Sequence, residues 1–182
     1  MSTSMASERL RGYVRVARAP FLALPVTLVI LGSAAAMVTG GFDPVAAFLA
    51  FVGRLSLHIS VNARNEYRDY HSGIDHETDP TPFSGGSKAL PEGDLEPKAA
   101  KRLALATAGI GAVLGGYFLI DVGLVLLPLI VIGAVSVLFY TSHLARYGMG
   151  ELFAGLGLGG LPVLGTALVQ VGHLTLPMVL VS

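Results

Sequence analysis

The sequence predicts an all-α membrane protein, a polytopic bundle of transmembrane helices with its N-terminus in the cytoplasm. Of 182 residues, 53% are hydrophobic and only 13% are charged, and the mean hydropathy is +0.68. This composition is too apolar for a soluble domain of the same length. Long apolar windows recur, and the basic residues fall on alternate connecting segments. Both patterns are typical of helices that cross a bilayer.

The apolar windows give the helices in order. A helix needs about 20 mostly apolar residues to cross roughly 30 Å of hydrocarbon. Five windows approach this length, at residues 21–38, 45–62, 103–120, 122–140 and 152–171. Another apolar run begins at Leu174, shortly before Ser182 ends the chain. We therefore expect five spans and the start of a sixth.

The segment before the first span has two interpretations. It carries Arg9, Arg11, Arg15 and Arg18, and small residues at 33–36 resemble a signal-peptide cleavage site. The following apolar run is longer than a usual signal-peptide core. The arginines are therefore better explained by an amphipathic helix that lies at the membrane interface.

Charge placement predicts the orientation. Beyond the N-terminal arginines, the basic residues other than Arg54 lie in the loops after the second and fourth spans, whereas the opposite loops carry only Asp43 and Asp121. The excess of Lys and Arg in cytoplasmic loops places the N-terminus and both basic loops in the cytoplasm, with the helices in the cell (inner or plasma) membrane. Basic and acidic residues are equal at 12 each, which gives no field that favours nucleic acid. Cysteine is absent, so thiolate metal sites are excluded.

Polar residues follow one face of the second predicted helix. We call this set the polar stripe; its members are separated by 4, 4, 3 and 4 residues and are Arg54, His58, Asn62, Asn65 and Asp69. A charged side chain at the bilayer centre costs roughly 2.5 to 3.5 kcal/mol on insertion scales, so the stripe is expected to face protein or a water-filled cavity. For Arg54 and His58, a structural bond to a neighbouring helix is the alternative.

The end of the stripe leads into a long hydrophilic loop, residues 63–101 approximately, with the chemistry of a metal-diphosphate site. Asn65 and Asp69 are followed by Asp75, Glu77 and Asp79. Carboxylate and amide oxygens suit a hard cation such as Mg²⁺, which completes its shell with water and phosphate oxygens. Arg64, Arg68 and Lys88 are candidates to neutralise phosphate, and the backbone amides of residues 84–87 are candidates for an anion-binding nest. A plainly solvated acidic loop is the alternative.

The stretch at 62–75 resembles the first Asp-rich motif of the UbiA superfamily of intramembrane prenyltransferases. Within it, the branch of 1,4-dihydroxy-2-naphthoate prenyltransferases in menaquinone synthesis is the most similar, with its motif N-x-x-N-D-x-x-D-x-x-x-G-x-D. Glu66 stands where that branch usually has Asp, and the residues in register are Asn62, Asn65, Asp69, Gly73 and Asp75. The segments TPFSGGSKALPEG (81–93), RAPF (18–21) and, in shortened form, YTSHLARYGMGE (140–151) are also similar to the family.

The resemblance implies Mg²⁺-dependent transfer of an isoprenyl group from a prenyl diphosphate to an aromatic acceptor such as 1,4-dihydroxy-2-naphthoate. Asp69 and Asp75 would be catalytic, and they would bind the metal together with Asn65 and Glu66. The residues implied in substrate binding are Arg18, Asn62, Arg64, Arg68, Lys88, Tyr140 and Arg146.

The family also has a second Asp-rich motif on a later cytoplasmic loop, and no such motif follows in this sequence. Residues 1–182 are therefore expected to be the N-terminal part of one prenyltransferase domain, inactive without a C-terminal half. The alternative is a non-catalytic membrane subunit or a transporter fragment that binds an anionic lipid or ion. A CDP-alcohol phosphatidyltransferase is disfavoured because its D-x-x-D-G-x-x-A-R pattern is absent.

Overall fold

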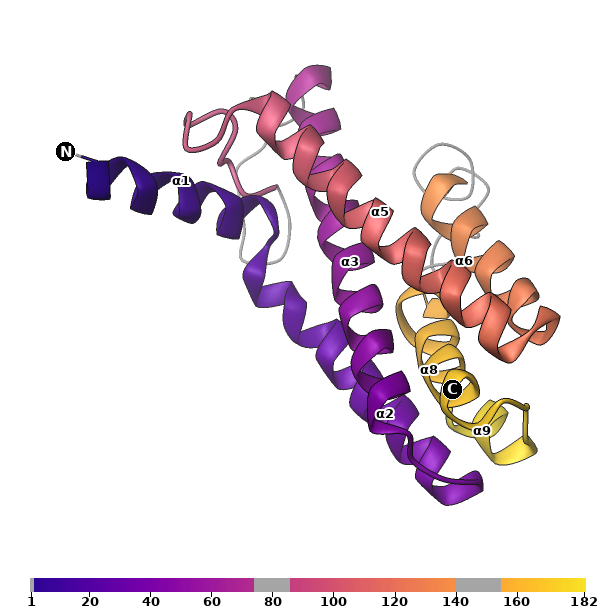
Figure 1. The fold of residues 1–182 in the computed structure, drawn as a ribbon. Coiled ribbons are helices and arrows are strands. Elements are labelled where there is room, and N and C mark those ends of the chain that lie inside the picture. The colour runs from indigo at the N-terminus through magenta and orange to yellow at the C-terminus, as the bar shows by residue number, and fades with distance from the viewer. Residues whose placement is uncertain (1, 74–85, 140–154) are drawn as a thin grey trace. The chain divides into compact units, whose positions relative to one another are not determined.

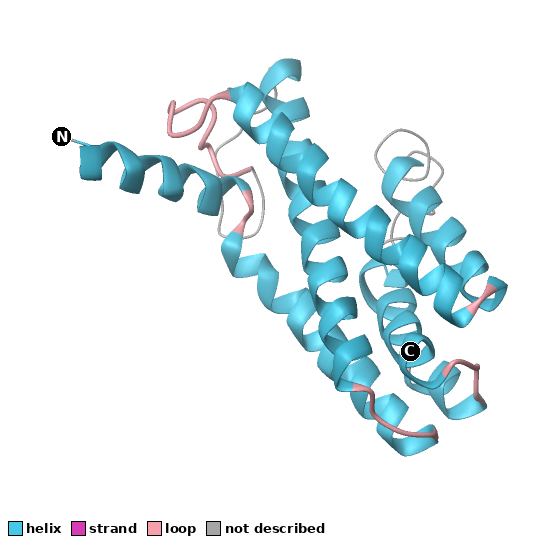
Figure 2. Cartoon of the chain, in the orientation of Figure 1, coloured by secondary structure: helices cyan, strands magenta, loops and turns pink. Residues whose placement is uncertain are grey.

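The computed structural model describes residues 2–73, 86–139 and 155–182, and within these ranges all regular secondary structure is helical (Figures 1 and 2). The predicted all-α class is therefore confirmed. In chain order the elements are α1 (Ser2–Val16), η1 (Ala19–Leu22), α2 (Ala23–Thr39), α3 (Pro44–Ser72), α5 (Pro97–Val122), η2 (Leu124–Leu126), α6 (Leu127–Phe139), η5 (Leu156–Gly160), α8 (Leu161–Val171) and α9 (Leu176–Val181).

Within the described ranges, three helical segments are long and apolar enough to cross a membrane: Ala19–Thr39, Pro44–Ser72 and Pro97–Val122. They contain the first three predicted windows. Two shorter apolar helices, Leu124–Val135 and Leu156–Val171, lie in the fourth and fifth windows, and residues 140–154 between them are outside the described ranges. The structure thus has a helix in every predicted window, whereas the count of five complete spans stays a prediction.

The surface of the helices fits a membrane protein. Large apolar side chains are widely exposed, with Val38 at 82% and Ile120 at 88%. A soluble protein rarely exposes so much contiguous apolar surface, because the hydrophobic effect opposes its contact with water. The chain is therefore an integral membrane protein.

Local sequence signals explain where two helices begin and end. Asp43 caps α3: its Oδ1 accepts hydrogen bonds from the backbone N–H groups of Val45, at 2.8 Å, and Ala46, at 3.0 Å. Pro44, which has no N–H group, occupies the first turn at no cost. At the other end of a helix, Gly172 follows α8 with a φ of 80°, the left-handed conformation that glycine adopts freely at a helix C-terminus.

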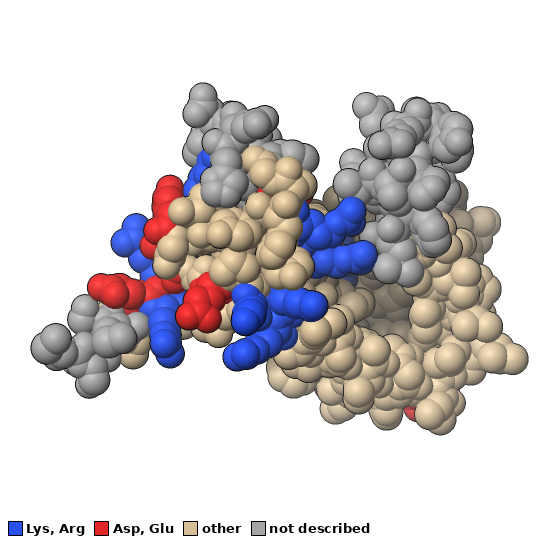
Figure 3. Space-filling model, turned by 90° about the horizontal axis from the view of Figure 1, so that it is seen from above, with Lys and Arg blue, Asp and Glu red and all other residues tan. Residues whose placement is uncertain are grey.

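The chain divides into two compact units. Unit 1 comprises Met1–Ala23 and Ser56–Ile110, and unit 2 comprises Leu24–Leu55 and Gly111–Ser182. Among the described charged residues, only Asp43, Arg54 and Asp121 belong to unit 2. On the face that Figure 3 presents, blue and red side chains gather over one part of the surface and much of the rest is tan. Unit 1 is therefore the charged part of an otherwise apolar chain.

The core of unit 1 includes the segment that connects α3 to α5. Ala89, Leu90 and Leu95 of this segment are at most 5% exposed, and they pack with Val16 of α1 and Ala63 of α3, among others. The connection was expected to be a hydrophilic loop. Its apolar residues instead bury against three helices, so residues 86–96 form a packed element of the fold.

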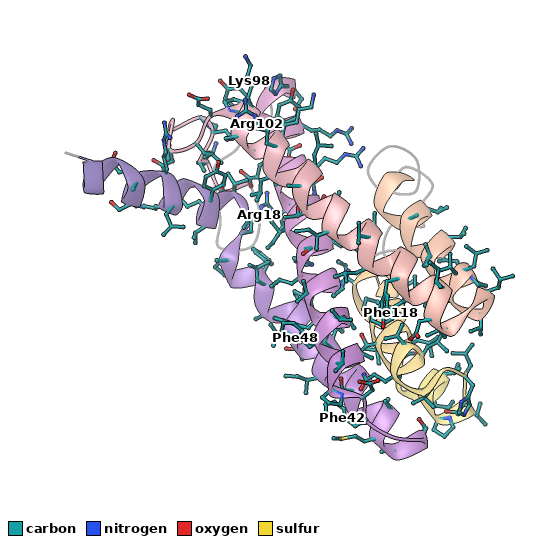
Figure 4. All side chains as sticks on the ribbon, viewed as in Figure 1. Arg18, Phe42, Phe48, Lys98, Arg102 and Phe118 are labelled. Atoms are coloured by element: carbon teal, nitrogen blue, oxygen red, sulfur yellow. The ribbon has the colours of Figure 1, made fainter. Side chains whose placement is uncertain are left out.

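The core of unit 2 depends on small residues. A β-carbon added at Gly32 of α2 would lie 2.6 Å from the carbonyl oxygen of Val163 in α8, so α2 and α8 approach closely through glycine. Gln170 reinforces this contact by donating to Ser33 Oγ at 3.0 Å. The large aromatic side chains of the same unit differ in burial: Phe118 belongs to a core cluster and is 5% exposed, whereas Phe48 is 62% exposed. Figure 4 labels both residues.

Candidate functional site

The predicted motif begins on α3 within unit 1, and residues 62–72 form about the last three turns of this helix. The helix continues unbroken to Ser72, ten residues beyond the apolar window that ends at Asn62. Because it stays helical, Asn62, Asn65 and Asp69 keep the spacing that places them on one face. Asn65 and Asp69 are half-buried. Asp75, the last acidic residue of the motif, lies outside the described residues.

Glu66, the third motif residue in chain order, is completely buried, at 0% exposure. Its Oε1 accepts hydrogen bonds from Arg18 Nε and from the backbone N–H of Ser87, both at 2.8 Å. Its Oε2 accepts one from Ser87 Oγ at 2.6 Å. A buried carboxylate is tolerated when it is both paired with a cation and hydrogen-bonded, and Glu66 meets both conditions.

Arg18 approaches Glu66 from the junction between α1 and η1, where Figure 4 labels it. Its backbone is left-handed, with φ 53° and ψ 59°, a conformation that costs a non-glycine residue roughly 1 to 3 kcal/mol. The side chain of Asn62 donates to the carbonyl oxygen of the preceding Ala17 at 2.9 Å. Asn62 and Glu66, one helical turn apart on α3, therefore hold the same two-residue junction.

Ser87 is bound from two helices. While its N–H and Oγ donate to Glu66 of α3, its carbonyl oxygen accepts a hydrogen bond from Arg15 of α1 at 2.5 Å. Arg15 also bonds to the carboxylates of Glu92, at 2.6 Å, and Asp94. Hydrogen bonding to Glu92 raises the pKa of Arg15 above its ordinary value. The residue is therefore a permanent cation beside the segment.

A close backbone contact completes this attachment. A β-carbon added at Gly12 of α1 would lie 2.4 Å from the carbonyl oxygen of Asp94 and 3.1 Å from Leu95 Cβ. The helix and the 86–96 segment can therefore approach this closely only because residue 12 is glycine. In this way α1, α3 and the segment form one joined arrangement around Glu66.

The remaining predicted phosphate-binding residues are differently placed. Arg64 and Arg68 are exposed, and Lys88 is half-buried with a left-handed φ of 59°. Figure 4 labels two further cations of unit 1, Lys98 and Arg102, in the first turns of α5. Tyr140 and Arg146 lie outside the described residues. Of the residues predicted to bind substrate, unit 1 contains Arg18, Asn62, Arg64, Arg68 and Lys88.

The donor set available for a metal is small within the described ranges. They contain no group of three or more His, Asp or Glu residues placed to hold an ion. Asn65 and Asp69 offer one amide and one carboxylate a helical turn apart. This set fits Mg²⁺, which commonly takes one or two carboxylates and fills its other positions with water and substrate phosphates.

The structure also shows residues that the sequence analysis missed. Arg15, Gly12 and the hydroxyl group of Ser87 were not predicted to shape the site. The Ser-Gly-Gly-Ser sequence indicated a special backbone, but the Ser87 N–H expected in an anion nest is donated to Glu66. The buried segment did have a signal, since Ala89, Leu90 and Leu95 interrupt an otherwise polar loop.

Comparison with known proteins identifies the family. Residues 23–182 match the sequence model of the UbiA prenyltransferase family. The chain belongs to the UbiA prenyltransferase family. The resemblance that rested on the motif at 62–75 is confirmed, and the match includes α3 with its motif and the 86–96 segment. Arg15 and Arg18 precede the residues matched to the UbiA model.

One curated protein that is similar to this UbiA chain is the 1,4-dihydroxy-2-naphthoate octaprenyltransferase of Bacillus subtilis (strain 168). It is 29% identical over 157 residues, which are 85% of this chain and 49% of the relative. The chain therefore spans about half the length of the curated relative it matches. No solved structure matches the chain.

Proposed function

We propose that this chain binds the metal diphosphate of an isoprenyl donor and belongs to an enzyme that transfers the isoprenyl group to an aromatic acceptor. One observation carries the proposal. In a chain of the UbiA family, Asn65 and Asp69 share a helix face in the charged unit, and Arg64 and Arg68 are their neighbours in sequence. Oxygen ligands and cations on one helix end suit a diphosphate that is bound together with its metal.

Asn65, Asp69 and Asp75 are the proposed Mg²⁺ ligands. When bound, the ion supplies Lewis-acid stabilisation to the departing diphosphate. Arg64, Arg68 and Lys88 neutralise the charge that grows on the phosphate oxygens as the allylic C–O bond breaks. The proposed roles of Tyr140 and Arg146 are further contacts to the donor. The isoprenyl carbon then bonds to the acceptor, which loses a proton to restore its aromatic ring.

The apolar helices supply the other requirement of this chemistry. An allylic cation reacts with water as readily as with an acceptor, so the reaction needs a dry site. Membrane-spanning helices provide that environment and also a place for the isoprenyl tail. By the distribution of basic residues, we propose that the charged unit faces the cytoplasm from the cell (inner or plasma) membrane.

The relative acts on 1,4-dihydroxy-2-naphthoate according to its name, which supports a dihydroxynaphthoate as the acceptor and a role in menaquinone synthesis. The test is a transfer assay on membranes that contain the complete reading frame around these 182 residues. It uses a radiolabelled prenyl diphosphate, Mg²⁺ and a panel of acceptors: 1,4-dihydroxy-2-naphthoate, 4-hydroxybenzoate and no acceptor.

We expect labelled prenyl-naphthoate product that depends on Mg²⁺ and is absent without acceptor. Product with 4-hydroxybenzoate alone would correct the acceptor and retain the enzyme class. Binding of the prenyl diphosphate without product from any acceptor would overturn the transferase and favour a binding subunit.

A further inference from the structure

We propose that Glu66 is a positioning residue, whose buried carboxylate fixes the turn at Ser87 and Lys88 to the metal-binding face of α3, and that it is not a metal ligand. The inference rests on the proposed function and deepens it. The motif alone would make Asn65, Glu66 and Asp69 metal ligands alike. The inference keeps that role for Asn65 and Asp69 and gives Glu66 a different one.

The bonding of Glu66 argues against a metal role. A carboxylate offers about four lone-pair sites, and Arg18 Nε, Ser87 N–H and Ser87 Oγ already use three of them, at 2.6 to 2.8 Å. The residue is 0% exposed, and its charge is paired with Arg18. Only one lone-pair site is left, on a carboxylate with no exposed surface, so Glu66 could reach an ion only by leaving this arrangement. That movement would leave Arg18 or Ser87 without its partner. Asn65 and Asp69 are half-buried, and among the described residues their side chains make no comparable set of hydrogen bonds.

The segment that Glu66 holds has an unusual backbone. Gly86 has a φ of 74° and Lys88 a φ of 59°. Such values persist in a non-glycine residue only where surrounding contacts determine them. Ser87, between these two residues, has its N–H and Oγ bound to Glu66 and its carbonyl oxygen bound to Arg15. These contacts therefore set the direction in which the chain leaves Ser87 and the position of Lys88.

The position of Lys88 matters because it is one of the cations proposed to neutralise the diphosphate. Glu66 lies between Asn65 and Asp69 in sequence and bonds directly to the residue before Lys88. One side chain thus joins the helix that carries the metal ligands to the turn that carries a phosphate-binding cation. Loss of this link is expected to weaken donor binding and to leave the metal affinity unchanged.

The experiment compares Ser87→Ala, Glu66→Ala and their double variant in the complete reading frame, with Glu92→Gln as the matched control. Glu92 is an exposed partner of Arg15 in the same segment. Three quantities are measured: KM for the prenyl diphosphate, the Mg²⁺ concentration at half-maximal rate, and hydrogen exchange of the amides of residues 86–95. Ser87→Ala removes only a hydroxyl, so it tests the inference even if Glu66→Ala does not fold.

We expect Ser87→Ala to raise KM for the prenyl diphosphate about fivefold, the effect of one ordinary hydrogen bond, with kcat and Mg²⁺ dependence unchanged. Exchange in residues 86–95 should accelerate, and the double variant should bind the donor no worse than Glu66→Ala. A tenfold rise in the Mg²⁺ requirement for Glu66→Ala, with Ser87→Ala like wild type, would show a metal ligand and overturn the inference.

Faster exchange with an unchanged KM would also overturn it, because Glu66 would then only stabilise the fold. A wild-type protein that transfers no isoprenyl group would overturn the proposed function itself, and with it the reaction that Glu66 is inferred to serve. The two failures are therefore distinct.

Discussion

Asn62 donates a hydrogen bond from Nδ2 to the carbonyl oxygen of Ala17 at 2.9 Å, across 45 residues of sequence. One turn later on α3, Glu66 binds Arg18, the residue after Ala17. Two members of the motif thus attach α3 to the junction of α1 and η1. Asn65 and Asp69 remain for the proposed metal, together with Asp75, which lies outside the described residues. The motif therefore combines residues that build the site with residues that would use it.

Asn62→Ala should lower the free energy of unfolding by about 1 to 3 kcal/mol, because the part-buried carbonyl oxygen of Ala17 loses its hydrogen-bond donor. Thermal unfolding in detergent measures this loss. Asn65→Ala is the matched control, and it should change Mg²⁺ dependence more than stability. An Asn62→Ala protein as stable as wild type would show that the hydrogen bond contributes nothing to the junction.

Gly12→Ala should loosen the 86–96 segment from α1. The added β-carbon would lie 2.4 Å from the carbonyl oxygen of Asp94, and backbone cannot yield as a flexible side chain can. Overpacking of this kind costs roughly 1 to 3 kcal/mol. Limited proteolysis and the melting temperature report it.

Gly109→Ala in α5 is the control for this substitution, since a β-carbon there meets nothing within 4 Å. An alanine should stabilise that helix by up to about 1 kcal/mol. Equal effects of the two substitutions would contradict the close approach of α1 to the segment.

The two partners of the buried ion pair should not be equally sensitive. Arg18→Gln leaves the fully buried Glu66 carboxylate without its cation, at a cost of about 3 to 5 kcal/mol. Glu66→Gln should cost clearly less, because the Arg18 side chain is 23% exposed and can be solvated. Chemical unfolding of both variants gives the comparison. A larger loss of stability for Glu66→Gln than for Arg18→Gln would mean that leaving Arg18 without its partner costs more than leaving Glu66 without its partner.

Arg54 is expected to be dispensable for stability. In unit 2 its Nη2 reaches the carbonyl oxygen of Gly157 at only 3.4 Å, and its Nε is buried without a partner among the described residues. Replacement of a poorly bonded buried charge by an apolar side chain is often neutral or stabilising, so Arg54→Met should melt at or above the wild-type temperature.

Gln170→Leu provides the contrast, since Gln170 donates to Ser33 Oγ and to the carbonyl oxygen of Thr166 at 3.0 and 2.9 Å. Its loss should cost about 0.6 kcal/mol, the average for such bonds between membrane helices. Marked destabilisation by Arg54→Met would reveal a stronger partner for the guanidinium and support a functional role for this end of the polar stripe.

The sequence was sufficient to predict where helices lie among the described residues and to place most of the motif on α3. Apolar windows long enough to cross a bilayer predicted α2, α3 and α5, because in a membrane the length and composition of a helix are tightly constrained. The spacing of Asn62, Asn65 and Asp69 correctly placed them on one helix, and the family resemblance carried by the same stretch was confirmed.

Contacts between residues that are far apart in the sequence could not be predicted from helical periodicity or composition. Helical periodicity shows that Glu66 lies beside Asn65, but it does not show that Arg18 and Ser87, 48 and 21 residues distant, meet its carboxylate. The burial of Leu90 and Leu95 under α1 likewise depends on how the segments pack. Such contacts decide which polar residues of a motif build the site.

The most direct test of the account is the effect of Asp69→Asn on Mg²⁺-dependent prenyl transfer by the complete reading frame, with Asp94→Asn as the control carboxylate of the same unit. The account predicts that Asp69→Asn lowers the rate by ~100-fold or more, the scale at which lost electrostatic stabilisation of a leaving group is felt, and raises the Mg²⁺ requirement. Asp94→Asn should keep the wild-type Mg²⁺ requirement. Wild-type transfer and an unchanged Mg²⁺ requirement in Asp69→Asn would contradict the metal-diphosphate assignment.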